Sequence, residues 1–155
     1  MVFDMREELF RDLSSFGGMP IYLAVMAITF FYNQLLLSQL FFGLLLAYFV
    51  TTSFRIAYFK NRPEKQKYRN WLEKIDASSF PSLHSMRSVV LVVILTSYFS
   101  NIFLTLFFVA VAASVVATRI LLKRHDPVDS IGGALMGFVL GLIVIAYAPL
   151  IPIGL

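Results

Sequence analysis

Long apolar stretches, almost free of charge, dominate this sequence and restrict what it can fold into. The first stretch covers residues 19–59, with Arg55 as its only charged residue, and three more cover 81–100, 101–122 and 127–148. A helix needs about 20 apolar residues to cross a hydrocarbon core that is roughly 30 Å thick. The pattern therefore predicts an all-α integral membrane protein and excludes an ordinary soluble domain.

Five membrane-spanning helices are expected within a single domain over residues 1–155. The first apolar stretch is about twice the length of one span. A cluster of polar residues near its middle, at 33–39, indicates a tight turn between two helices. The predicted spans lie near residues 19–37, 39–59, 81–99, 101–122 and 128–148.

Two amphipathic segments accompany the spans. Residues 1–18 place phenylalanine and leucine on one helical face and charged residues on the other, which is typical of a helix lying in the membrane interface. A second interfacial helix is expected around Trp71, in the loop before Pro81-Ser82-Leu83-His84. The N-terminal segment lacks the apolar core of a cleavable signal peptide.

The charged residues of the chain are distributed very unevenly. When five spans are threaded through a bilayer, all 22 of them, 13 Lys and Arg with 9 Asp and Glu, fall on one side or within a few turns of it. The positive-inside rule predicts that this side faces the cytoplasm and that the protein lies in the cell membrane. We interpret Arg87 and Lys123 as side chains that snorkel from span ends. No nucleic-acid partner is expected, because orientation and an anion site explain the net charge of +4.

Glycine recurs every four residues in the last span, at Gly133, Gly137 and Gly141. Such small residues let helix backbones approach closely within a membrane. Packing within one bundle is the favoured interpretation, because neighbouring antiparallel spans already offer partners. A homodimer interface through the same glycines is the alternative.

Several charges are candidate functional residues, because a charge at the edge of a membrane is costly to keep there. Arg55 and Arg62 are two helical turns apart and would share one helix face if the second span continued to Pro63. Ser82 and His84 lie at the expected start of the third span. A hydroxyl and an imidazole are thus placed at a helix N-terminus.

A third group of candidates lies between the fourth and fifth spans. Arg119 is followed by His125 and then by Asp129. Asp126 and Pro127 have the residue types of a helix N-cap and a first helical position.

These residue types favour phosphate chemistry. Guanidinium groups match phosphate oxygens in bidentate geometry, and helix N-termini offer free N–H groups. The chain has no cysteine and only two histidines, so His84, His125 and Asp129 would supply a nucleophile, a proton donor and an orienting carboxylate. Asp129 would hold His125 in one tautomer and stabilise its charged form.

The spacing of these residues resembles the type 2 phosphatidic acid phosphatase family, which is related to the vanadium haloperoxidases. The family pattern is Lys-x6-Arg-Pro, then Pro-Ser-Gly-His, then Ser-Arg-x5-His-x3-Asp. In the same order this chain has Arg55-x6-Arg62-Pro63, Pro81-Ser82-Leu83-His84 and Thr118-Arg119-x5-His125-x3-Asp129. Three motifs in register make the resemblance specific.

The resemblance implies hydrolysis of a phosphate or diphosphate monoester of a membrane lipid, through a phosphohistidine and without a metal or other cofactor. His125 would attack phosphorus, Asp129 would orient it, and His84 would protonate the leaving alkoxide and then activate water. The phosphate oxygens would be held by Arg55, Arg62, Arg119, Ser82 and the backbone N–H of Leu83. The candidate substrates are phosphatidylglycerol phosphate, phosphatidic acid and polyisoprenyl phosphates or diphosphates.

The chain also departs from the family. Arg55 keeps the charge of the usual lysine and Thr118 keeps the hydroxyl of the usual serine, but Leu83 replaces glycine and would be strained if that position required a positive φ. The N-terminal amphipathic helix would stand in for a sixth span that bacterial members commonly have. Two alternatives stay open, a non-catalytic membrane protein that binds lipid phosphate and a phosphotransferase that uses the same phosphohistidine.

Overall fold

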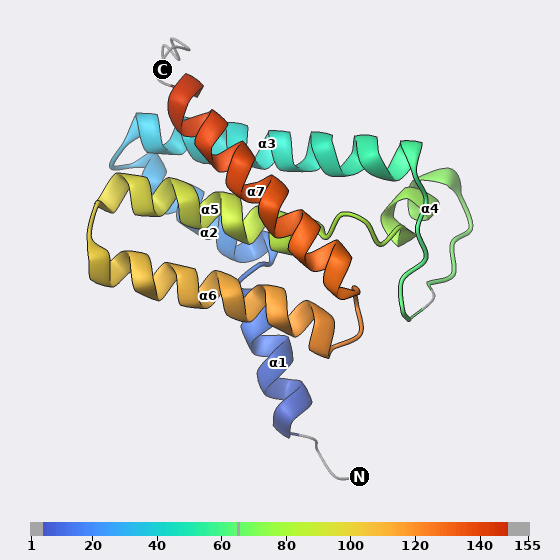
Figure 1. Cartoon of the computed structure of the whole chain (residues 1–155). Coiled ribbons are helices and arrows are strands. Elements are labelled where there is room, and N and C mark those ends of the chain that lie inside the picture. The colour runs from blue at the N-terminus through green and yellow to red at the C-terminus, as the bar shows by residue number, and fades with distance from the viewer. Residues whose placement is uncertain (1–4, 65, 149–155) are drawn as a thin grey trace.

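The computed structural model describes residues 5–64 and 66–148, and these residues form helices and connecting segments without any strand (Figure 1). The predicted all-α fold is confirmed in this part of the chain. Residues 1–4 of the expected N-terminal helix lie outside it. The helices are α1 (Met5–Ser15), α2 (Met19–Phe30), α3 (Gln34–Ala57), α4 (Trp71–Ala77), α5 (Leu83–Phe99), α6 (Ile102–Leu121) and α7 (Pro127–Tyr147).

Helix α5 forms the centre of the bundle. It packs against α3, α6 and α7, and α7 crosses it obliquely (Figure 1). Met86, Val90 and Ile94 of α5 are fully buried and form one core with Leu40 of α3 and Val144 of α7. The residues that position the functional site are therefore attached to a closely packed centre.

The outside of the bundle is apolar, as expected for helices that face lipid. Phe49, Phe103 and Leu135 are 69%, 78% and 64% exposed. Four segments of the described residues are long and apolar enough to cross a membrane, namely Met5–Phe30, Gln34–Ala57, Ile102–Leu121 and Pro127–Tyr147. Helix α5 is shorter, with 17 residues. These helices support the predicted integral membrane protein.

The first turn of the bundle occurs at residues 31–33, earlier than the polar cluster predicted. Asn33 is the N-cap of α3, and its side chain accepts a hydrogen bond of 2.8 Å from the N–H of Leu36. The 12 residues of α2 extend only about 18 Å, so a first span over residues 19–37 is wrong in its end and its length. The other polar residues of the cluster lie within the first turns of α3.

The glycines of α7 bring this helix against α5 of the same chain. A Cβ at Gly133 would lie 2.4 Å from the carbonyl oxygen of Ser82, and a Cβ at Gly137 would lie 2.4 Å from that of Met86. Gly141 also faces α5. All three glycines are buried, so they serve packing within the bundle, the favoured of the two interpretations.

Arg87 holds the N-terminal segment in place. Its guanidinium is buried and donates to the carbonyl oxygen of Gly17, from Nε at 3.1 Å and from Nη2 at 2.5 Å. Its Nη1 donates to the hydroxyl of Tyr48 at 3.2 Å. The interpretation of Arg87 as a snorkelling side chain is therefore wrong. It fastens the junction of α1 and α2 to α5.

The ends of the helices that carry the sequence motifs meet at one end of the bundle. The C-terminal ends of α3 and α6 and the N-terminal ends of α5 and α7 lie there, on the right in Figure 1, together with α4. Helix α1 packs on α6 and points away from the bundle. Two helix N-termini, with their free N–H groups, thus lie near the charged connections.

Candidate active site

Arg55 and Arg62 approach the same point from different elements. Arg55 lies in the last turn of α3, but α3 ends at Ala57, so Arg62 lies in the connection that follows. The predicted common helix face is therefore wrong. Both guanidiniums nevertheless donate to the carbonyl oxygen of Asp76, from Nη1 of Arg55 at 3.3 Å and from Nη2 of Arg62 at 2.7 Å.

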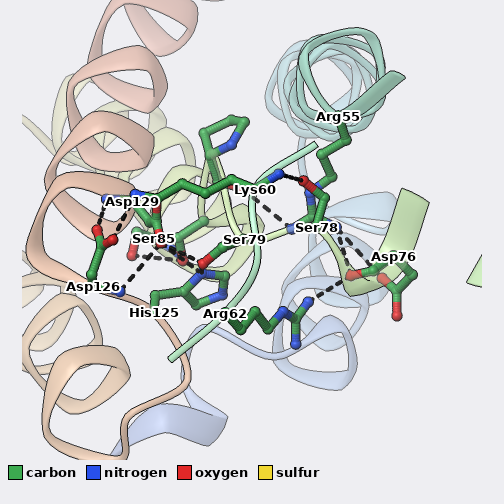
Figure 2. A network of polar contacts seen from close by, with 12 residues as sticks. Arg55, Lys60, Arg62, Asp76, Ser78, Ser79, Ser85, His125, Asp126 and Asp129 are labelled. Carbon is green, nitrogen blue, oxygen red and sulfur yellow. Dashed lines mark hydrogen bonds and ion pairs between the residues drawn. The ribbon is translucent and has the colours of Figure 1, made fainter. Parts of the chain in front are cut away.

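A buried network of polar contacts surrounds Asp129 (Figure 2). Its Oδ1 accepts from the Lys60 ammonium at 2.7 Å, and the same Nζ lies 2.6 Å from Oδ2 of Asp126. Its Oδ2 accepts from the Ser79 hydroxyl and, at 3.2 Å, from the N–H of Asp126. The Nδ1 atom of His125 lies 3.9 Å from Asp129 Oδ2 and 3.3 Å from Ser79 Oγ.

The start of α7 explains why Asp129 is held so firmly. Asp126 is the N-cap and accepts a 3.0 Å hydrogen bond from the N–H of Asp129, while the Asp129 side chain accepts from the N–H of Asp126. This is a reciprocal capping box, with Pro127 as the first helical residue. The predicted N-cap and first position are confirmed. His125 precedes the cap, and its N–H donates to the Arg119 carbonyl at 3.1 Å.

The start of α5 holds the Pro-Ser-Leu-His motif. Ser82 is the N-cap, and its Oγ accepts hydrogen bonds from the N–H and the hydroxyl of Ser85, at 3.4 and 3.1 Å. Among the described residues other than glycine, only Ser100 and Lys123 have a positive φ. Leu83 is therefore unstrained as the first residue of α5. Its N–H belongs to the first turn, where helical N–H groups lack an intrahelical partner.

A cavity of about 1210 Å³ lies between α1 and the connection from α6 to α7. His84 and Arg119 line it, together with residues of α1 and the basic pair Lys123 and Arg124. The Nη1 atom of Arg119 donates to the hydroxyl of Ser14 at 3.1 Å, so α1 contacts a motif arginine directly. One wall of the cavity is thus formed by the N-terminal amphipathic helix.

The three motif arginines share an unusual feature. The Nε atoms of Arg55, Arg62 and Arg119 are all buried, and none has a hydrogen-bond partner within residues 5–64 and 66–148. A buried donor without a partner costs about 1–3 kcal/mol, and more when the group is charged. Each of the three arginines therefore keeps one donor that no described residue uses.

His125 is surrounded by these same cations. Burial lowers its pKa most, and the charges of Arg62, Arg119 and Arg55 lower it further, to about 3. The ring is therefore neutral at pH 7, with one nitrogen lone pair available. A neutral imidazole among guanidiniums has the charge state required of a nucleophile that attacks an anion.

The structure thus places six of the predicted residues in three groups. Arg55 and Arg62 meet at Asp76, His125 and Asp129 meet in the Asp129 network, and His84 and Arg119 share the cavity.

Sequence reasoning missed Lys60 and Ser79, which contact Asp129 directly. In the sequence Lys60 is only one of the 13 Lys and Arg of the charged side. No sequence signal identifies its partner, because 69 residues separate it from Asp129. Ser79 stands two residues before Pro81, and its proximity to that motif was the one available hint.

Three arginines, two histidines and a buried carboxylate at one end of an apolar bundle define a helical membrane protein with a cationic, histidine-containing site. The sequence matches the PAP2 superfamily over residues 36–151, and the chain belongs to this superfamily. The resemblance seen in the three motifs is confirmed. No curated protein sequence matches significantly.

The fold is similar to the crystal structure of Aquifex aeolicus LpxE. The two chains share 19% sequence identity, with a TM-score of 0.79 over 93% of this chain and 87% of that chain. Family and fold together support a lipid phosphatase embedded in a membrane.

Proposed function

We propose that the protein hydrolyses a phosphate monoester, or a diphosphate, of a membrane lipid through a phosphohistidine on His125. The observation that carries this proposal is the set of buried Nε groups of Arg55, Arg62 and Arg119, which have no partner among the described residues and lie near a neutral imidazole. Guanidinium groups bind phosphate oxygens well, and a site preorganised for the charge of a transition state is the largest source of catalysis in many enzymes.

The chemistry requires two steps, one for each histidine. In the first step His125 attacks phosphorus and the bond from phosphorus to the lipid oxygen breaks. His84, which takes up a proton when the phosphate dianion binds in the site, gives that proton to the leaving alkoxide. In the second step neutral His84 takes a proton from water, the resulting hydroxide attacks phosphorus, and the bond to His125 breaks. Inorganic phosphate leaves and both side chains return to their starting states.

Two hollows beside the site suit a lipid substrate. The cavity of about 1210 Å³ is large enough for a headgroup and has Lys123 and Arg124 on its lining. A smaller groove of about 300 Å³ between α3 and α4 is lined by Arg55 and by apolar side chains that include Leu83 and Leu72. The leucine that replaces the family glycine thus offers apolar contact for a lipid chain beside a phosphate-binding arginine.

We expect the purified protein in detergent to release inorganic phosphate from at least one of phosphatidylglycerol phosphate, phosphatidic acid and a polyisoprenyl phosphate. Release should persist with a chelator of divalent ions and should be inhibited by vanadate, which mimics five-coordinate phosphorus. Phosphatidylglycerol, a phosphodiester, is the matched control and should yield none.

Release from none of the monoesters, or full release at saturating vanadate, would contradict the proposal. Transfer of phosphate to an added alcohol in place of water would identify the phosphotransferase alternative.

We also propose that the active-site end faces the cytoplasm across the cell membrane, as the one-sided charge predicts. Because the chain has no cysteine, single cysteines can be introduced without a background signal. A cysteine at exposed Lys67, in the connection between α3 and α4, should resist a membrane-impermeant maleimide in intact cells and react in inverted vesicles. A cysteine at Tyr32, in the turn at the opposite end, should show the reverse pattern. Labelling of Lys67→Cys in intact cells would place the site outside.

A further inference from the structure

Ser79 lies between the two residues that the family pairs directly. The 3.9 Å between Asp129 Oδ2 and His125 Nδ1 is too long for a hydrogen bond. The Ser79 hydroxyl bridges this separation, because its Oγ donates to Asp129 Oδ2 and lies 3.3 Å from His125 Nδ1 (Figure 2). All three side chains are buried, so water does not compete for these contacts.

The number of protons determines the direction of each hydrogen bond. A serine hydroxyl has one hydrogen, and an ionised carboxylate can only accept. Ser79 therefore donates to Asp129, and its oxygen is left to accept from His125. Nδ1 of His125 must then carry the proton, which leaves the lone pair on Nε2.

We propose that Ser79 is a positioning residue that transmits the influence of Asp129 to His125 and selects the tautomer with the proton on Nδ1. This inference rests on the proposed function, in which Nε2 of His125 attacks phosphorus. When the bond from Nε2 to phosphorus forms, the ring becomes cationic and Nδ1–H becomes a stronger donor. Ser79 and, through it, Asp129 stabilise that charge, and no proton has to move between them.

Lys60 holds both Asp129 and Ser79 in place. Its ammonium occupies Oδ1 of Asp129 at 2.7 Å, and its carbonyl oxygen accepts from the N–H of Ser79 at 2.7 Å. Burial disfavours the charged form of Lys60, but the hydrogen bonds of Lys60 to Asp126 and Asp129 raise its pKa overall. One residue thus fixes the carboxylate through its side chain and the serine through its backbone.

The test combines kinetics with ¹⁵N NMR of histidine-labelled protein in detergent. The chain has only two histidines, so the variant His84→Gln assigns the signals of His125. In the wild type, the His125 shifts should report a neutral ring with the proton on Nδ1, and they should stay so down to pH 5, because the lowered pKa keeps the proton off Nε2.

In Ser79→Ala we expect a mixture of tautomers. The value of kcat should fall about 10- to 100-fold, the range found when the partner of a metal-ligating histidine is removed. KM should change little, because Ser79 is placed against the histidine and not against the phosphate. Ser79→Thr keeps the hydroxyl and should restore both the tautomer and most of kcat.

Ser130→Ala is the matched control. Ser130 follows Asp129 on α7, is equally buried, and its hydroxyl has no hydrogen-bond partner within the described residues. The variant Ser130→Ala should therefore leave the tautomer of His125 and the value of kcat near those of the wild type.

A wild-type tautomer and kcat in Ser79→Ala, or an equal loss in Ser130→Ala, would overturn the positioning role. The tautomer is measured without turnover. If the wild type released no phosphate, the proposed function would be refuted, but the NMR result would still decide whether Ser79 selects the tautomer of His125.

Discussion

Replacement of His125 by alanine is expected to abolish phosphate release, with kcat falling on the order of 10⁴-fold or more, because the covalent route loses its nucleophile. His125 is one of only two histidines, so no other imidazole can take over the attack. The same variant should form no phosphorylated protein when it is mixed with ³²P-labelled substrate and quenched in base, in which phosphohistidine survives.

His84→Gln is the matched comparison, because it removes the other imidazole. With an aryl phosphate, whose leaving group needs no protonation, this variant should still be phosphorylated on His125. The intermediate should then accumulate, because no base remains to activate water. Labelled protein in His125→Ala, or turnover close to wild type, would refute His125 as the nucleophile.

The second large effect is expected from Arg62→Met. This change removes a half-buried guanidinium whose buried Nε has no partner among the described residues. We expect kcat to fall about 10²- to 10³-fold, the usual loss when one preorganised donor to a developing negative charge is removed. Steady-state kinetics measure the loss of kcat, and vanadate inhibition measures the affinity for the phosphate analogue. The value of kcat and the affinity for vanadate should fall together.

Arg69→Met is the control for Arg62→Met, because Arg69 is an exposed arginine in the same connection between α3 and α4. It should leave kcat near wild type. Arg62→Lys keeps the charge but loses the planar fork, so partial recovery is expected. Full activity in Arg62→Met would remove this residue from the phosphate site, and equal losses in Arg62→Met and Arg69→Met would point to a general effect of charge.

Local sequence signals predicted the elements of this fold well. The apolar stretches predicted long helices, and the pair Asp126-Pro127 predicted the start of α7, because a capping residue and a proline act on backbone groups within one turn. The first turn was misplaced because several polar residues compete there, and only Asn33 caps a helix. The polar pattern alone does not show which of these residues caps the helix.

The contacts between elements were harder to predict. Arg55 and Arg62 meet at Asp76, although they do not share a helix. Arg87 was mistaken for a snorkelling residue because its partner, the carbonyl oxygen of Gly17, lies 70 residues away. Every residue has a backbone carbonyl oxygen. A sequence therefore does not show which of these oxygens will be buried and available to accept a hydrogen bond from a side chain.

The sequence by itself determined that this chain is an α-helical membrane protein of the PAP2 superfamily, and it predicted phosphate chemistry from the three motifs. Hydropathy, capping and motif spacing act over a few residues, so they can be read along the chain. Only the tertiary structure decided that Ser79 stands between Asp129 and His125 and that Lys60 holds the other carboxylate oxygen. The physical reason is that a hydrogen bond depends on a few tenths of an ångström between groups from different elements, and only the packing of α5 and α7 on the connecting segments sets that distance.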